Sequence, residues 1–235
     1  MKQFVLLFLS LTTFLSCQDS ESQKPLTLTQ EKPQTPLSFS NVTLIDKFKD
    51  ELVLDTLSSS KTAKFSALYM GSLSDSIVIN YRNADQNHLV RVWEKHRTPS
   101  KDELSIYIDT TKHIGSPTDY MSWRETSSIA PHRALSYPIF IRNHSKDTLR
   151  IGFGDYFPMI TEAKDSTGLW IPIQERFIYM CGTGVPSIVL APNEIALTSI
   201  KKGCAKQYTK LRIRFELYNE QDIYSNEINA AVNHD

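Results

Sequence analysis

Residues 210–217, near the end of the chain, alternate without a break between charged and apolar side chains. The apolar members are Leu211, Ile213, Phe215 and Leu217. An α-helix would spread these four side chains around its circumference, whereas a β-strand places all four on one face. The alternation therefore predicts a strand with one face on a core and the other toward water. The residues expected to face water are Lys210, Arg212, Arg214 and Glu216.

Shorter segments with β-branched or alternating apolar residues recur along the chain, with Asn, Asp, Ser, Pro and Gly between them. We expect strands within 76–81, 89–93, 104–109, 139–141, 149–153, 159–163, 169–173, 188–190, 195–200 and 227–232. Residues 139–153 are interpreted as strand, turn and strand, residues 159–173 as a hairpin, and residues 110–130 as a long loop. Pro172 cannot donate to a sheet ladder, so its strand is expected at an edge or a bulge. Short strands about ten residues apart predict an all-β fold, specifically a sandwich.

The N-terminus has the three parts of an export signal: a basic head, an apolar run at residues 4–15 and a small residue before a cysteine. The run is shorter than the roughly 20 residues that a membrane-spanning helix needs. The sequence Phe14, Leu15, Ser16, Cys17 resembles the lipobox of bacterial lipoproteins, although Phe14 stands where Leu is usual. The resemblance implies that Cys17 is lipidated, with acyl chains such as palmitate anchoring the protein in a membrane. The alternatives are an ordinary secretory signal with a chance cysteine, or a cytoplasmic protein.

These features predict four successive parts of the chain. Residues 1–16 are expected to be a signal peptide, and residues 17–42, which are polar and punctuated by proline, a flexible tether with a reach of about 25–30 Å. Residues 43–130 form a smaller β-rich region, and residues 131–235 the Ig-like sandwich.

The composition gives no sign of a nucleic-acid partner. Twenty-six basic and 26 acidic side chains cancel, so no overall field draws in a polyanion. A hydrophobic content of 40% is enough for a real core.

Two cysteines remain beyond Cys17, namely Cys181 and Cys204. In an exported protein an even pair indicates a disulfide, which would close a loop of about 23 residues and stabilise the fold by about 3 kcal/mol. The alternatives are two free buried thiols or a cysteine nucleophile.

Several segments resemble lipoproteins of Bacteroidetes to which no activity is assigned. They are ITEAKD at 160–165, GLWIPI at 168–173, FIYMCG at 177–182, LAPNE at 190–194, KLRIR at 210–214 and YSNE at 224–227. The resemblance covers roughly residues 100–232 and implies a lineage without a mechanism. The strand, proline turn and strand within it are also generally Ig-like, a feature shared by many unrelated binding domains.

This lineage implies a second modification, O-glycosylation of Ser or Thr directly after Asp. The matching residues are Thr56, Ser76, Thr110, Thr148 and Ser166. The alternative is ordinary turn chemistry, because Asp followed by Ser or Thr is common beside strands.

No pattern predicts catalytic residues, a metal site or a cofactor. The chain has no GxSxG or HExxH motif, and Gly182 and Gly184 lack the third glycine of a dinucleotide loop. His132 and His144 could face each other across a hairpin but have no third ligand at zinc spacing. A glycine–aromatic loop at Asp155, Tyr156 and Phe157 is the candidate binding loop, with a simple bulge as the alternative. Trp170 is expected in the core.

The sequence thus predicts a non-enzymatic binding or structural module of the cell envelope, anchored to the outer membrane through Cys17 and facing either the periplasm or the outside. Its expected partner is an envelope or extracellular protein. The first alternative is an immunity or inhibitor protein that neutralises a toxin or a protease. The second is an enzyme of unfamiliar type that uses loop carboxylates such as Asp155 and Glu162.

Overall fold

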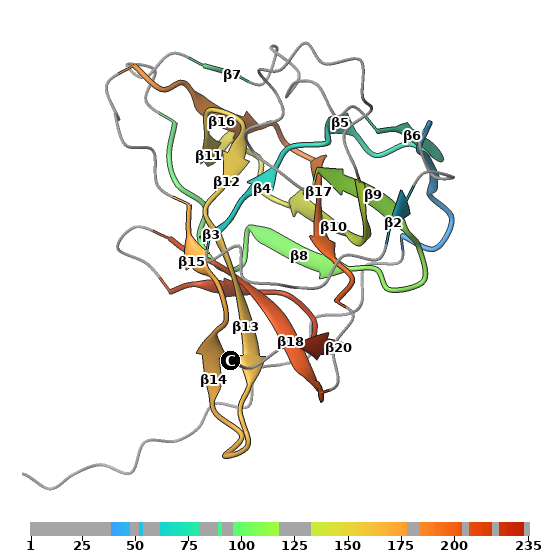
Figure 1. Cartoon of the computed structure of the whole chain (residues 1–235). Coiled ribbons are helices and arrows are strands. Elements are labelled where there is room, and N and C mark those ends of the chain that lie inside the picture. Colours follow the sequence, from blue (N-terminus) through green and yellow to red (C-terminus); the bar gives the residue numbers. More distant parts are fainter. Residues whose placement is uncertain are drawn as a thin grey trace, which may run out of the picture. The chain divides into compact units, whose positions relative to one another are not determined.

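The part of the chain that can be described consists of β-strands and their connections. The computed structural model describes residues 39–47, 52–53, 62–79, 89–90, 96–117, 133–177, 184–203, 207–217 and 221–232. All of them belong to one compact unit, Pro36–Asp235. Every regular element among them is a strand (Figure 1), which confirms the predicted all-β class.

The strands form three larger sheets and two short pairs. Sheet I has the order β2 (Leu52–Val53), β10 (Arg133–Asn143), β17 (Glu194–Lys201), β5 (Tyr69–Ser72), with β8 (Leu104–Ile108) and β9 (Ile114–Pro117) also paired to β10. Sheet II has the order β4 (Phe65–Ser66), β12 (Tyr156–Phe157), β11 (Leu149–Phe153), β16 (Ser187–Leu190), β7 (Leu89–Val90). Sheet III has the order β14 (Trp170–Pro172), β13 (Met159–Lys164), β18 (Gln207–Phe215), β19 (Ile223–Tyr224), with β20 (Ile228–Val232) also paired to β18. The parallel pairs are β1 (Thr43–Ile45) with β6 (Ser76–Val78), and β15 (Glu175–Arg176) with β3 (Thr62–Ala63).

Each segment expected to contain a strand does contain one, and Pro172 lies in β14, which ends the described order of sheet III as expected of an edge strand. The hairpin predicted for residues 159–173 is confirmed by the pairing of β13 with β14. The loop predicted for residues 110–130 is wrong in part, because β9 lies within it and pairs with β10. The fully buried side chain of Ile114 explains why this stretch is held as a strand.

The turn at residues 143–147 joins two sheets rather than two strands of one hairpin. β10 lies in sheet I and pairs with β17, whereas β11 lies in sheet II and pairs with β16. The return connection between β16 and β17, at residues 191–193, crosses between the same two sheets. Two neighbouring chain segments therefore pass from one sheet to the other at the same place, in opposite directions.

Asn143 holds these two crossings together, and its side chain is fully buried. Its amide nitrogen donates to the carbonyl oxygens of Asp147 at 2.8 Å, Leu190 at 2.9 Å and Ala191 at 3.1 Å. Its side-chain oxygen accepts from the Ser145 N–H, and its own carbonyl accepts from the N–H of Asn193, a residue with a φ of 62°. One fully buried side chain thus bonds to carbonyls of both crossings.

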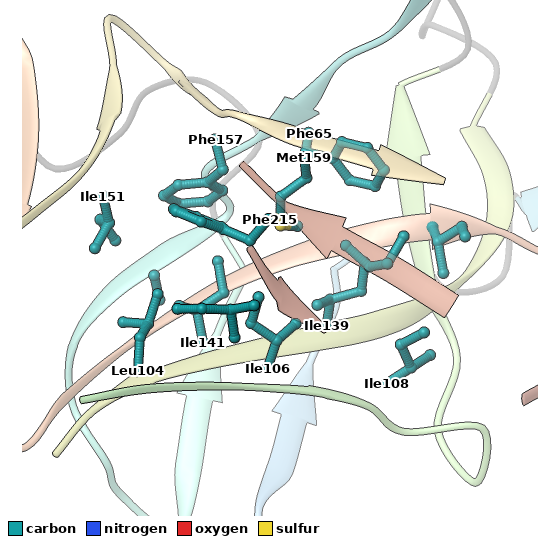
Figure 2. Packing of buried hydrophobic residues seen from close by; sticks show 14 of the residues in the cluster. Phe65, Leu104, Ile106, Ile108, Ile139, Ile141, Ile151, Phe157, Met159 and Phe215 are labelled. Atoms are coloured by element: carbon teal, nitrogen blue, oxygen red, sulfur yellow. The ribbon is translucent and has the colours of Figure 1, made fainter. Parts of the chain in front are cut away.

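The main hydrophobic core draws on all three larger sheets. Figure 2 shows Phe157, Met159 and Phe215 on one side facing Ile139 and Ile141 on the other, and all five are at most 1% exposed. Strands from before and after residue 131 contribute to this cluster, among them β8 through Leu104, Ile106 and Ile108. The two β regions expected at 43–130 and 131–235 therefore share a sheet and a core.

A second cluster covers the other face of β10 and β17. Phe140 stacks on Phe39 with ring centroids 4.2 Å apart, and Ile195 and Leu197 belong to the same cluster. Phe39 is 2% exposed, so the body already begins within the last residues of the segment expected to be a tether, 17–42. Lys112 ties this segment down, since its Nζ donates to the Phe39 carbonyl and to the buried Asp109.

We predict that Asn143→Ala lowers the free energy of unfolding by about 3 kcal/mol, because the buried Leu190 carbonyl loses its donor and the hydrogen bonds to Asp147 and Ala191 are lost with it. Urea denaturation measures the loss. The matched control is Asn229→Ala on the exposed side of β20, which should change stability by less than about 0.5 kcal/mol. Equal effects of the two substitutions would contradict a special role for Asn143.

Candidate functional site

The outward face of sheet III carries a cluster of charged and aromatic side chains. The register places Glu162 opposite Arg212, Lys164 opposite Trp170, and Arg214 opposite Tyr224. Opposite residues in a sheet point to the same side, and so do residues two apart along one strand. These six side chains therefore share one face, and we call them the outer cluster.

Glu162 is the centre of the outer cluster, and its side chain is only 7% exposed. One carboxylate oxygen accepts from Arg212 Nε at 2.9 Å. The other lies 2.7 Å from Arg214 Nε in an ionic contact without hydrogen-bond geometry. A single buried negative charge thus serves two guanidinium groups.

Arg212 lies between two aromatic rings. Its guanidinium carbon is 4.3 Å from the centre of the Trp170 ring and 3.9 Å from the centre of the Tyr224 ring. Lys164 Nζ is a further cation near Trp170, at 5.0 Å. Cation–π contacts of this kind contribute about 0.5–2 kcal/mol each, more as water is excluded, and they hold the guanidinium plane in one orientation.

The surroundings of the outer cluster shift the pKa values of Arg214 and Tyr224. Burial would lower the pKa of Arg214, but the hydrogen bond to Asp222 at 2.9 Å and the charge of Glu162 raise it overall. Burial raises the pKa of Tyr224, so its hydroxyl stays protonated well above neutral pH. Arg214 therefore stays charged and Tyr224 stays neutral at physiological pH.

The outer cluster corrects three expectations from the sequence. Arg212 and Arg214 do not simply face water, since each side chain is only 20% exposed. Trp170 is not a core residue, because it covers Arg212 on the outer face. Glu162 is not a loop carboxylate but lies inside β13. The alternation in 210–217 correctly predicts which side chains point outward. The cluster itself could have been found by comparing these positions with the outward positions of β13 and β14.

A second polar group surrounds the crossing at residues 143–147. Ser105 Oγ and His144 Nε2 are 2.7 Å apart. Burial lowers the pKa of His144, and the positive charge of Arg142 lowers it further by a smaller amount. Among the described residues no carboxylate bonds the other ring nitrogen, and Ser105 is 7% exposed. The pair therefore links β8 to the crossing and has no accessible nucleophile. His132, the other histidine considered with His144, lies outside the described residues.

Beside this pair, Arg97 connects three segments. It donates to both carboxylate oxygens of Glu103, at 2.6 Å for Nη1, and to Asp147 at 2.8 Å. The fork of Arg97 and two hydrogen bonds from Ser100 lower the pKa of Glu103 to about 2. The arrangement fastens the turn at residues 143–147 to the segment before β8.

The candidate binding loop is mostly buried. Tyr156 and Phe157 are 8% and 1% exposed, so their rings pack inside, and Phe157 belongs to the main core. Asp155 pairs with Lys64 at 2.8 Å, and Lys64 also lies 5.2 Å from the centre of the Phe177 ring. A ligand at this loop would meet Asp155 rather than the two aromatic rings.

The candidate modification sites divide between described and undescribed parts of the chain. Cys17, Thr56, Cys181 and Cys204 lie outside the described residues. The other candidates for O-glycosylation are exposed at Ser76, Thr110 and Ser166 and half-buried at Thr148. Asp109 and Asp165, which precede two of them, accept hydrogen bonds from the N–H groups two residues on, which is turn chemistry.

Within the described ranges, no group of three or more His, Cys, Asp or Glu side chains could hold a metal ion. The same residues include no helix of the length and apolar character needed to cross a membrane. No protein-family model, curated protein or solved structure matches the chain. The outer cluster is therefore interpreted from its own geometry.

We predict that Glu162→Gln lowers the free energy of unfolding by about 2–3 kcal/mol, because it leaves two guanidinium groups without their shared carboxylate. Urea denaturation measures the loss. Glu227→Gln is the matched control: its carboxylate is 45% exposed and 3.9 Å from Lys164, so the expected change is below about 1 kcal/mol. A Glu162 effect no larger than that of the control would show that the outer cluster does not depend on this carboxylate.

We predict that the Glu103 carboxyl titrates near pH 2, which carboxyl-carbon NMR measures directly. Because its pKa is lowered from the ordinary value of 4.5, its stabilisation is complete above pH 4.5 and is lost as the pH falls toward 2. Arg97→Gln should move the midpoint back up, and Glu103→Gln should reduce the acid-dependent loss of stability over this range. A midpoint near 4.5 in the unaltered protein would show that the hydrogen bonds from Arg97 do not lower the pKa of Glu103.

Proposed function

We propose that the protein is a lipoprotein of the bacterial cell envelope, anchored to the outer membrane through Cys17, whose β body acts as a non-enzymatic binding or structural module. The observation that carries the proposal is the sequence Phe14, Leu15, Ser16, Cys17 directly after a short apolar run. The polar stretch that follows provides a tether to the body, which begins by Phe39. The resemblance to Bacteroidetes lipoproteins agrees with this location.

We further propose that the body belongs to the Ig-like sandwiches. The two crossings at 143–147 and 191–193 support this, because they place consecutive strands in opposite sheets around one core, as sandwiches do. The edge position of Pro172 fits the same architecture. A sandwich offers rigid sheet faces and loops on which a binding surface can be carried.

The anchoring prediction is tested on whole cells of the producing bacterium. The intact mass of the purified protein should correspond to a chain beginning at Cys17 with acyl chains attached, and Cys17→Ser should release an unlipidated form from the membrane fraction. An unlipidated wild-type chain would refute the anchor.

Protease treatment of the same cells distinguishes the two faces of the membrane. A lipidated body removed from intact cells faces the outside and is available to external partners. A body that is protected until the outer membrane is broken faces the periplasm and serves a partner of the envelope. Turnover of a substrate by the purified protein would refute the non-enzymatic part of the proposal.

A further inference from the structure

Arg212 has donors that the fold does not use. Only Nε is engaged, by Glu162, and among the described residues neither Nη1 nor Nη2 has a hydrogen-bond partner. Neither is among the buried polar atoms that lack one, so both reach solvent. Two parallel N–H groups at the end of a guanidinium match the two oxygens of a carboxylate.

The charges beside Arg212 also favour an anion. Lys164 and Lys210 each lie one residue beyond the register pair Ala163 and Leu211, so they are next to each other on the outer face. Like charges at opposite positions destabilise a sheet. Among the described residues, the only carboxylate that pairs with Lys164 is that of the exposed Glu227, at 3.9 Å, and none pairs with Lys210. The part of the outer face that carries Lys164, Lys210 and Arg212 is therefore positively charged and complements a negatively charged group.

The residue types of this face are those on which protein partners bind. Trp, Tyr and Arg dominate the energetics of protein interfaces because they bury a large area with few rotamers and retain polar ends. Tyr208 lies two residues from Lys210 on the same strand, and its side chain is 79% exposed. Tyr224 is 36% exposed although one side of its ring faces Arg212.

We propose that the outer face of sheet III is the binding surface for a protein partner, and that Arg212 receives a Glu or Asp carboxylate of that partner. The proposal rests on the binding role proposed above and names its site. Trp170 and Tyr224 hold the guanidinium plane before the partner arrives, so little side-chain entropy is lost on binding. Lys164 and Lys210 attract the acidic segment, and Tyr208 supplies apolar contact area beside them.

The test uses the full mature chain with Cys17→Ser, so that binding is measured in solution and does not depend on lipidation. A displayed library of random short peptides is selected against this protein, and the best peptide is synthesised with its Glu or Asp and with Gln or Asn in that position. NMR of the arginine side-chain N–H groups and of the tryptophan indole N–H groups follows each titration.

Selection should enrich acidic peptides, and the Arg212 signals should shift on binding. Replacing the peptide's carboxylate by its amide should weaken the Kd by about tenfold or more, and Arg212→Lys should remove most of this preference. Lys210→Gln, which alters an exposed side chain outside the aromatic stack, should weaken binding severalfold. Arg150→Lys is the matched control, since Arg150 lies 5.4 Å from the Phe153 ring on sheet II and should bind as the parent does.

Three results would overturn the proposal: no enrichment of acidic peptides, equal affinity for the acidic and amide peptides, or an unchanged preference in Arg212→Lys. Binding of an acidic oligosaccharide such as oligogalacturonate at Arg212, with no peptide binding there, would also overturn it in favour of a sugar site. None of these results bears on Cys17, so the anchored location stands or falls by the whole-cell experiment alone.

Discussion

The buried amide of Asn143 is the contact on which the arrangement of sheets I and II depends. Two chain segments pass side by side between sheets I and II, in opposite directions, and at such crossings the backbone carbonyls lose their ladder partners. The amide of Asn143, which is itself fully buried, donates to three of them, from both segments. A hydroxyl would have too few donors, and a carboxylate would repel the carbonyls. The register of β10 with β17 and of β11 with β16 is thereby fixed at one point.

Fixing β10 at this point has a consequence for the rest of the body, because β10 is covered on both faces. Ile139 and Ile141 face the main core, while Phe140 between them stacks on Phe39. A strand that is buried on both faces needs apolar side chains packed against each face. For β10, one of the two faces is covered by residues from the chain before residue 80. This explains why the N-terminal β region and the C-terminal strands share a core, a question that the strand pattern in the sequence leaves open.

The strands could be predicted from the sequence because alternation and β-branched runs are local properties. Apart from the hairpin of β13 and β14, their partners could not be predicted. The residues at 143–147, for example, suit a turn within one sheet as well as a crossing between two. The outer cluster shows the same limit. The period in residues 210–217 placed Arg212 on the outward face, but whether water or another side chain covers it depends on Trp170 and Tyr224, which reach it from β14 and β19. What covers Arg212 is decided by the order of the strands in the sheet, which the residues around Arg212 do not encode.

The side chains of the outer cluster stabilise sheet III and also form the proposed binding surface. Glu162 accepts a hydrogen bond from Arg212 Nε within the sheet, and an aromatic ring packs on each side of the guanidinium, so its position is set by the fold. A charge held in this way interacts more strongly with an incoming carboxylate than a free lysine would, because the surroundings are less polar and the donors are already oriented. The same rigidity makes Arg212 structurally costly to replace, which is why discrimination between a carboxylate and its amide is more informative about binding than loss of affinity alone.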